Sequence, residues 1–405
     1  MLIISAVFAQ SSLLSISGFG EKIESNDASS IALGDSKFFS GNSFSISRSS
    51  PSSLWKTNLA NLYITGSLNK NNMGNDVNEI KENHLHIISF SFPVGTYKAC
   101  SLGFSPMYRG NTTVVEQDLN FIGADQSPTN LPIAFRTTYD FSGGISELFG
   151  IYSMKFSERI SFGIRLSKLF GNSNYRYVLS SYNVDIEEAE SVSYDEFDTS
   201  FGNFKQRYSS SSYKVELRYY KDNFEVVGSY LKTKSLKIKL TPEYDLIGQS
   251  NSELYYIDKT MNEFDLGLKY SFNDKLGIII ESHKSNDFDS FAFLNIFRIN
   301  SPDIISNHFG IYHKKRINKE NNLDQINFRA GIYSKKYEFI NSNLKDYGFT
   351  FGIGFEYNKN MNLIDLAFVI GNRESDYIAI DSEKYYKFIF SITSSEKWFE
   401  RKEKE

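Results

Sequence analysis

The chain has 405 residues, with 44 Lys and Arg against 48 Asp and Glu, and a formal net charge of −4 at pH 7. This balance argues against nucleic acid as a main partner, because phosphate binding needs a clear basic excess. A single cysteine, Cys100, excludes an internal disulfide framework and a multi-cysteine metal site. The 35 Phe and 26 Tyr favour strands, and no apolar run approaches the length of a transmembrane helix.

The first residues, MLIISAVFAQ, have the pattern of the end of a secretory signal peptide. A short apolar run leads to the small residue Ala9, which suits cleavage before Gln10. Residues 1–9 are therefore predicted to be a signal-peptide remnant, although a basic start is absent. The alternative interpretation of this run is a buried first strand.

Residues 10–53 are rich in Ser, Gly and Asn, and they show little strand alternation. From composition alone, a disordered periplasmic tail is the simplest interpretation of this segment.

From residue 54 onwards, apolar and polar residues alternate along many segments. Side chains of a strand point to opposite faces, so each segment has one apolar face and one small or charged face. No segment shows a helical period of comparable strength. The clearest segments are residues 160–167, 213–219, 264–272, 326–332 and 347–357.

Short and long connections alternate between these segments. The short ones contain Asn, Asp or Gly, which close hairpins, and lie at residues 95–96, 157–159, 221–223, 273–274, 318–322 and 358–360. The long polar ones cover residues 70–83, 110–143, 171–211, 241–262, 285–306, 339–346 and 372–384. Fourteen strands fit between them. An even count, with short turns at one rim and long loops at the other, predicts an all-β fold, a transmembrane antiparallel β-barrel.

A soluble sandwich or an array of hairpins is the alternative. Sandwich strands usually have about 5–6 residues, whereas these segments are longer and suit a tilted membrane crossing. Their lengths also vary, which disfavours a propeller. The pattern therefore favours a barrel of the bacterial outer membrane.

The chain ends with KYYKFIFSITSSEKWF, residues 384–399, and a charged tail at residues 400–405. Its aromatic face is predicted to contact lipid, and Trp398 and Phe399 to lie near the periplasmic interface, where aromatic girdles occur. The barrel is therefore predicted to span residues 54–399. The residues of the lipid-facing side are Tyr386, Phe388, Phe390 and Ile392.

Both ends of the chain resemble a known family, the long-chain fatty-acid transporters of bacterial outer membranes. The opening motifs are Gly18-Phe19-Gly20, Ala32-Leu33-Gly34 and Ser50-Pro51-Ser52-Ser53-Leu54. The last departs from the family pattern, because Ser replaces both Asn and Ala. The closing strand, with its WF pair and basic tail, resembles divergent relatives from Bacteroidetes-like bacteria.

The resemblance implies a fourteen-stranded barrel with an N-terminal plug in its lumen, and passive uptake of hydrophobic molecules. Residues 10–53 would form this plug, with Gly18, Phe19, Gly20, Gly34 and Pro51 as its motif residues. No cofactor or metal is expected.

Charged residues recur on the polar faces of the predicted strands. A charge facing lipid at the midplane would cost about 2–4 kcal/mol for Arg or Lys, so these side chains are expected to point inward and pair across the lumen. Such networks are usually structural and only sometimes filter a permeating molecule. The candidate lumen residues are Arg165, Glu216, Arg218, Asp265, Lys269, Arg329, Glu356 and Asp365.

Two further features are weaker. His84 and His86 are spaced to share one strand face, but no third ligand is placed to complete a metal site, so a pair at the barrel rim is the favoured interpretation. The acidic run at residues 185–198 is expected to be a solvated external loop; the alternative is a cation site shared with lipopolysaccharide phosphates. No hydrolase, P-loop or zinc-protease motif occurs, so no enzyme activity is predicted.

The leading hypothesis is passive uptake of small hydrophobic molecules such as fatty acids through a plugged outer-membrane barrel. The alternative is a non-transporting barrel that anchors secreted or surface proteins. Expected partners are outer-membrane lipid and lipopolysaccharide, a hydrophobic small molecule and, for the alternative, a secreted protein. Transport predicts an apolar pocket that reaches a gap in the wall or plug, whereas a platform predicts a sealed lumen.

Overall fold

The computed structural model describes most of the chain. The described residues are 7–10, 19–23, 26–42, 46–47, 49–73, 78–116, 133–187, 191–244, 248–249, 253–257, 260–286, 291–293, 297–299, 302–317, 323–339, 343–358, 362–376 and 382–396. The motif residue Gly18, the aromatic pair Trp398 and Phe399, and the charged tail lie outside them. Within the described part, no helix is long and apolar enough to cross a membrane.

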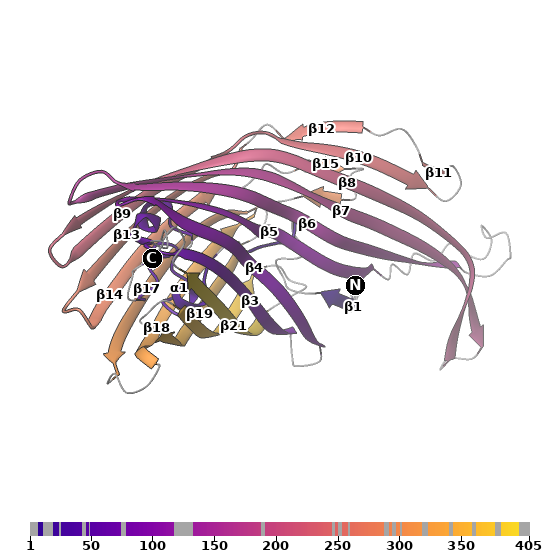
Figure 1. Cartoon of the computed structure of the whole chain (residues 1–405). Helices are drawn as coiled ribbons and strands as arrows, with labels where there is room; N and C mark the ends of the chain where they lie inside the picture. The colour runs from indigo at the N-terminus through magenta and orange to yellow at the C-terminus, as the bar shows by residue number, and fades with distance from the viewer. Residues whose placement is uncertain are drawn as a thin grey trace, which may run out of the picture.

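Fourteen strands of the described residues form a closed antiparallel barrel, as the sequence predicts (Figure 1). Each strand pairs with its neighbours in the chain, and the last strand pairs along its whole length with the first. The barrel strands are β3 (Ala60–Met73), β4 (Asn78–Gly95), β5 (Lys98–Glu116), β6 (Ile133–Lys155), β7 (Ile160–Glu187), β8 (Ser191–Lys221), β9 (Phe224–Thr233), β13 (Asn262–Ser271), β14 (Leu276–Asn286), β17 (Asp303–Arg316), β18 (Leu323–Glu338), β19 (Asn343–Tyr357), β20 (Asn362–Ser375) and β21 (Ser382–Glu396).

The remaining elements are short. They lie before the first barrel strand or in the connections between later ones. They are β1 (Val7–Gln10), β2 (Glu21–Lys22), α1 (Ala28–Ile31), the 3-10 helix η2 (Pro51–Lys56), β10 (Leu236–Tyr244), β11 (Gly248–Gln249), β12 (Glu253–Ile257), β15 (Phe291–Phe293) and β16 (Phe297–Ile299).

The outer surface of the barrel is apolar and the inner surface is polar. On β21, Tyr386, Phe390 and Ile392 are exposed, whereas Ile389 and Ser391 are buried on the inner side. The same alternation continues around the wall, which is the pattern of a lipid-facing band. Exposed members of this band include Leu68, Leu102, Leu148, Leu217, Phe264, Ile280, Phe309, Phe349 and Ile370.

Much of what the composition predicts to be long external loops is in fact strand. The predicted loop at residues 171–211 consists mostly of β7 and β8, and the loop at residues 241–262 contains the end of β10 and all of β12. A strand of 31 residues such as β8 is about 100 Å long at roughly 3.3 Å per residue, far more than a membrane crossing needs. The Ser, Asn and Tyr of these stretches look like loop residues, but pairing with neighbouring strands decides the structure.

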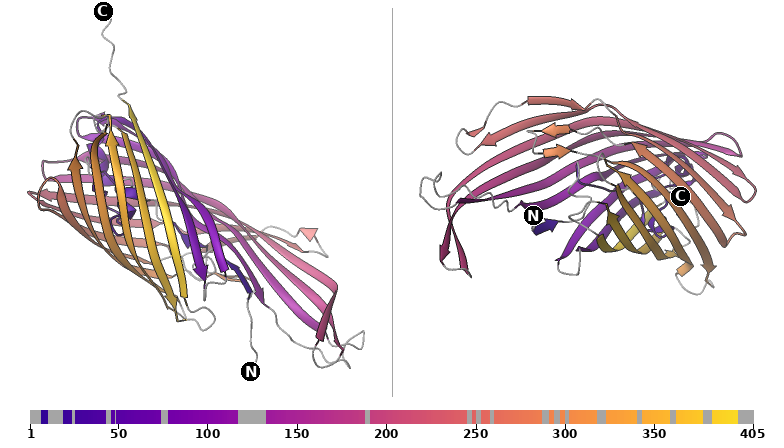
Figure 2. Two further views of the ribbon diagram at one scale, coloured as in Figure 1. Left: turned by 90° about the horizontal axis from the view of Figure 1, so that it is seen from below. Right: turned by 180° about the vertical axis from the view of Figure 1, so that it is seen from behind.

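These long strands form a sheet that projects to one side of the barrel (Figures 1 and 2). We call this sheet the extension. Its inner face carries a buried cluster of Phe141, Tyr175, Phe204 and Leu240. The extension consists of residues 110–116, 133–144, 171–187, 191–208 and 236–257, within the described ranges.

The described residues of the N-terminal segment lie inside the barrel. Those between Phe19 and Thr57, here called the luminal segment, are almost all buried. Asp27 begins α1 by accepting a hydrogen bond from the Ser30 amide at 2.7 Å, as an N-cap residue does. Ser47 and Ser49 both donate to the Lys37 carbonyl, at 3.0 and 2.6 Å. The Ser-rich composition therefore serves compact turns inside the lumen.

The luminal segment bonds to strands around the wall. The Ala28 amide donates to Ser391 on β21 at 2.8 Å, and Lys314 on β17 donates to the Asn42 carbonyl at 3.0 Å. The Gly34 amide donates to Thr350 on β19 at 2.8 Å. Gly34 has a φ of +75°, and a Cβ there would lie 2.5 Å from the Phe309 carbonyl oxygen, so only glycine fits.

The other described motif residues of the segment also contact the wall. Phe19 packs edge-on against Tyr108 and Tyr208, with ring centroids 5.8 and 5.4 Å apart. Gly20 approaches the Arg109 backbone, and Pro51 lies against Gly163 at the first turn of η2. The described motif residues therefore lie at contacts between the segment and several strands of the wall, among them β5, β7 and β17.

Candidate functional site

All eight predicted lumen residues lie on the inner face of the barrel. Each side chain is at most 8% exposed, and Glu216, Arg218 and Glu356 are fully buried. The alternation of the strands therefore predicts their orientation correctly. Their role in permeation stays a prediction.

Four of the eight residues belong to two ionic clusters that include or contact the luminal segment. Arg218 bonds to Glu225, and it donates to Ser52 at 3.0 Å and to the Phe38 carbonyl at 3.1 Å. Glu216 accepts hydrogen bonds from Ser50 and Ser52. The strand charges therefore bind the polar groups of the segment.

In the Arg218 cluster, Lys269 on β13 also lies 3.3 Å from Glu225 on β9. The second cluster is built around Asp265 on β13, which lies 3.3 Å from Lys214. Lys37 of the luminal segment adds a further cation, 2.8 Å from Glu263. Buried charges are costly unless they are paired in this way.

Lys56 lies on η2, near the end of the luminal segment, and is a further cation of the Arg218 cluster. Its ammonium lies 3.8 Å from Glu225 and 4.9 Å from the centre of the Tyr220 ring. Burial lowers the pKa of Lys56 to about 8, although Glu225 acts in the opposite direction.

The other four predicted residues are placed separately. Arg329 donates to Asp365 at 2.8 Å, and Glu356 accepts from Asn327 at 2.6 Å on the neighbouring strand. Arg165 bonds to Glu147 and covers the Phe149 ring. The structure therefore divides the eight residues among several local networks.

A further ionic cluster was not predicted. Arg373, on β20, lies 2.7 Å from Glu21, 3.2 Å from Asp346 and 3.2 Å from Glu383. Lys387 also binds Glu21, at 3.2 Å. Arg373 falls within the predicted loop at residues 372–384, whereas the structure places it on β20. Its neighbours Asn372 and Glu374 are more exposed than Arg373, as strand alternation requires.

Little free space remains between the luminal segment and the strands. The cavities there measure about 30 to 70 Å³. Spaces of that size hold a few water molecules at most. Between the described residues of the segment and the wall, cavities of this size do not hold a molecule as large as a fatty acid.

The wall itself is open on one side. The β4–β5 ladder ends at the pair Ile88 and Phe104, so residues 78–87 of β4 and residues 105–116 of β5 are not paired with each other. Pro106 lies two residues after Phe104 and lacks the amide hydrogen that a strand donates to its neighbour. We call this opening the seam.

The backbone bends away from β4 at the same level. β5 has an irregularity between Pro106 and Tyr108, where Met107 has no partner in the register with β6. On β6, Gly143 and Gly144 have φ values of +126° and +151°. A Cβ on Gly144 would lie 2.0 Å from the Tyr108 carbonyl oxygen, so the two strands can approach only through glycine.

The N-terminal segment covers part of the free edge of β5. In β2, Glu21 and Lys22 pair with Arg109 and Tyr108. Further along, β1 pairs with residues 112–115 of the same strand. Residues 7–9, predicted as signal remnant, are therefore part of a paired strand in this structure.

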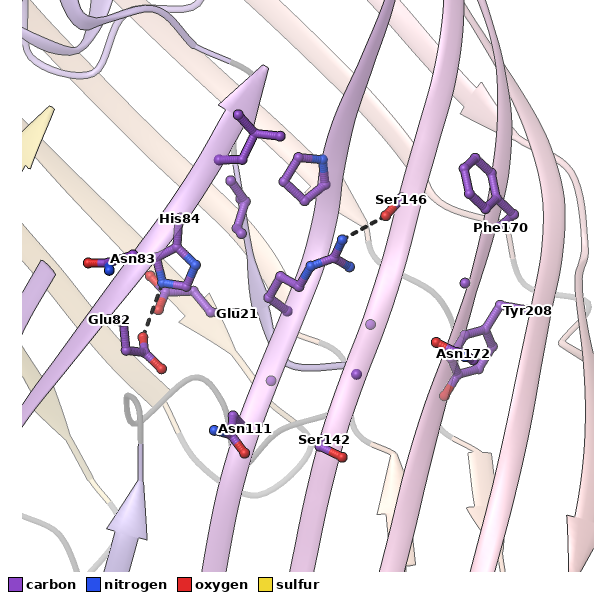
Figure 3. A pocket seen from close by; sticks show the side chains of 18 of the residues that line it. Glu21, Glu82, Asn83, His84, Asn111, Ser142, Ser146, Phe170, Asn172 and Tyr208 are labelled. Atoms are coloured by element: carbon purple, nitrogen blue, oxygen red, sulfur yellow. Dashed lines mark hydrogen bonds and ion pairs between the residues drawn. The ribbon is translucent and has the colours of Figure 1, made fainter. Parts of the chain in front are cut away.

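A cavity of about 1010 Å³ lies at the seam (Figure 3). Its apolar lining comes from Leu85, Phe104, Pro106 and Phe170. The rings of Phe104 and Phe170 lie 6.3 Å apart, and Phe170 belongs to the exposed outer face. The apolar part of the cavity is therefore continuous with the lipid-facing band.

The other part of the cavity is polar. Arg109 donates to Ser146 at 2.8 Å and to the Tyr108 carbonyl at 3.1 Å, and His84 lies 3.1 Å from Glu82 (Figure 3). His86 instead contacts Ser67, at 3.0 Å. In the described residues, no group of three His, Cys, Asp or Glu side chains is arranged to hold a metal ion.

The cavity therefore combines an apolar wall with a charged part, in which Lys81, Arg109 and Arg207 outnumber the acidic Glu21 and Glu82. This arrangement suits an amphipathic molecule with an anionic head. Sequence reasoning missed this site, because residues 110–143 were assigned to a loop. The sequence signals that could have located it are Pro106 and the Gly143-Gly144 pair, which interrupt strand patterns.

A comparison of the sequence with models of known protein families identifies the family of this protein. The family model described as BamG matches residues 1–404. This chain belongs to the BamG family. A search of curated proteins finds no match to this BamG-family chain.

Solved structures with the same fold include hydrophobic-compound channels. A Pseudomonas aeruginosa FadL homologue has 12% identity and a TM-score of 0.55, with 93% of this chain and 98% of that chain covered. The P. putida toluene transporter TodX has 13% identity and a TM-score of 0.53, with 95% and 100% covered. The resemblance predicted from the two ends of the chain is confirmed at the level of the fold.

Proposed function

We propose that this BamG-family barrel takes up small hydrophobic molecules, such as fatty acids, in the bacterial outer membrane. The molecules pass through the wall at the seam and do not follow the barrel axis. The unpaired stretch of β4 and β5 beside a cavity of about 1010 Å³ is the observation that carries this proposal. A solved protein of the same fold, the toluene transporter TodX, which is also described as a monoaromatic hydrocarbon channel, supports a small hydrophobic substrate.

The route follows from where apolar surface is available. The lumen is filled with ion pairs between the luminal segment and the strands. An acyl chain that entered it would separate these pairs and leave buried charges without partners, which is costly. At the seam, the acyl chain of the fatty acid moves past Leu85, Phe104 and Phe170 into the lipid. Arg109 binds the carboxylate of the fatty acid until the molecule leaves the cavity. The movement is driven by the concentration gradient alone.

The test is to block the seam reversibly. In a Cys100→Ser background, Leu85→Cys is modified with a bulky thiol reagent that dithiothreitol removes. The matched control is Leu102→Cys, which lies on the paired part of β5 and is 62% exposed to lipid. Uptake of a labelled fatty acid into vesicles is measured before modification, after modification and after release.

We expect modification at Leu85 to abolish most of the uptake, release to restore it, and the control to be unaffected. Equal uptake with the seam blocked would contradict a route through the wall. No uptake by the unmodified protein would contradict transport itself.

The second candidate is a non-transporting platform for secreted or surface proteins. It is supported by the filled lumen and by the extension, whose edge strand β12 exposes Leu254 and Tyr256 at 63% and 55%. Exposed apolar side chains on a sheet edge are typical of a protein contact. Cross-linking in cells, with Leu254→Ser/Tyr256→Ser as the variant, tests it. Loss of a cross-linked protein together with unchanged uptake would support the platform as a separate function.

A further inference from the structure

The outer face of the extension and of the adjoining part of β7 and end of β9 carries a dense group of cations. By register, Asn172 of β7 lies opposite Arg207 of β8, and Arg207 lies opposite Lys239 of β10. Alternation places the buried Leu169, Tyr208 and Ile238 on the opposite face. We call the group the basic patch. Its members, all exposed, are Lys168, Lys205, Arg207, Lys232, Lys234, Lys237 and Lys239.

Few acids balance this charge. Near the cations on this face, the acidic Glu243 pairs with Lys205 at 3.1 Å, whereas six of the seven cations have no such ion pair with it. Arg207 and Lys239 lie directly opposite each other across two strands, although like charges in such pairs are destabilising. The rest of the chain is slightly acidic overall, so this local excess of cations is specific to the face.

The basic patch directly follows the lipid-facing band. Lys168 lies between the exposed Leu166 and Phe170 on β7. Lys232 lies opposite the exposed Tyr213. Aromatic residues mark the edge of the hydrocarbon region, and cations just beyond it lie at the level of lipid headgroups.

We propose that the basic patch binds the phosphate groups of a phosphorylated glycolipid in the outer leaflet. Lys and Arg side chains, among them Lys168, Arg207 and Lys239, donate charge-assisted hydrogen bonds to the phosphate oxygens. The acyl chains lie against Leu166, Phe170 and Tyr213 below the patch. Bound lipid neutralises the Arg207 and Lys239 repulsion and holds the extension close to the membrane surface.

The experiment uses full-length protein in detergent. Native mass spectrometry measures retention of lipid A, a diphosphorylated glycolipid, and of the same glycolipid after removal of its phosphates. The patch variant is K168Q/R207Q/K237Q/K239Q. The matched control removes four exposed lysines from the far side of the barrel, K284Q/K336Q/K345Q/K384Q. Heat-modified gel mobility checks that each barrel is folded.

We expect the patch variant to retain about tenfold less lipid A, because each cation near an anionic surface contributes measurably, and the control to retain it as the parent protein does. The dephosphorylated glycolipid should bind weakly to all three. If the fourfold variant does not fold, Arg207→Gln alone should still lower retention severalfold.

Three results would overturn the assignment. Equal loss in the patch variant and the control would show that no local site exists. Displacement of lipid A by inorganic phosphate at equal concentration would indicate a general anion site without lipid specificity. Unchanged lipid retention, with loss of an acidic surface protein from the patch variant in cells, would assign the patch to a protein partner.

Discussion

The two sides of this barrel differ in how completely their strands pair. From β13 to β21, every strand pairs fully with its neighbours, and the lumen behind them is packed with the luminal segment and paired charges. From β4 to β8, the wall is open at the seam, and the strands continue far outside the barrel. The comparison shows that a β-barrel can keep one side as a rigid frame while the other side carries an opening.

Energetics explains why the two features can coexist. A free strand edge in lipid would leave backbone groups without partners, which the bilayer does not tolerate. Here β1 and β2 supply partners to β5, and the closed side supplies the stability that the open side lacks. Substitutions in the packed lumen should therefore cost much more than those at the seam or on the extension.

The largest expected effect is at Arg218, on the part of β8 that lies in the barrel wall and binds the luminal segment. Arg218→Met leaves Glu216 and Glu225 buried without their main cation. We expect a loss of about 3–5 kcal/mol in the free energy of unfolding, as for other broken buried pairs. Urea unfolding in detergent measures it. Arg207→Gln on the extension is the control and should change stability by less than about 0.5 kcal/mol; similar losses in both would erase the contrast.

The next effect is at Gly34, where the luminal segment meets the closed wall. Gly34→Ala places a Cβ 2.5 Å from the Phe309 carbonyl oxygen at a φ of +75°. We expect a cost of about 1–3 kcal/mol and faster proteolysis of the segment. Gly150→Ala is the control, since its nearest contact would be Leu102 at 3.6 Å. Unchanged proteolysis would mean that the segment is not held by this contact.

On the open side, Arg109→Gln should alter uptake and leave stability nearly unchanged. A neutral amide keeps a hydrogen bond to Ser146 but loses the charge that faces the cavity. We expect about tenfold weaker uptake of a fatty acid, which corresponds to about 1.4 kcal/mol, and no change for its methyl ester. Vesicle uptake of both compounds checks this, and equal losses for acid and ester would argue against charge recognition.

The smallest effect is expected at the exposed pair of Lys205 and Glu243. These side chains are 53% and 33% exposed, so Lys205→Gln should change the free energy of unfolding by only about 0–1 kcal/mol. The matched buried pair is Lys37 and Glu263, at 8% and 7% exposure, where Lys37→Gln should cost several times more. Equal values from urea unfolding would show that burial does not set the difference.

The sequence predicts the closed side well and the open side poorly. Alternation around Phe264, Phe349 and Phe390 predicts lipid-facing positions, because successive side chains of a barrel strand point in turn to the lipid and to the lumen. On the open side, Tyr175 and Phe204 sit in Ser- and Asn-rich stretches whose strand structure depends on pairing with distant partners. The ionic partners, such as Lys37 with Glu263, are 226 residues apart, so no local pattern could join them.

The luminal segment is linked directly to the strand that closes the ring. The segment precedes β3, and its Ala28 amide bonds to Ser391 on the final strand. The ring closes where β21 joins β3. The strand that completes the wall therefore also supplies an acceptor for the segment inside it, so closure of the barrel and retention of the segment depend on the same strand.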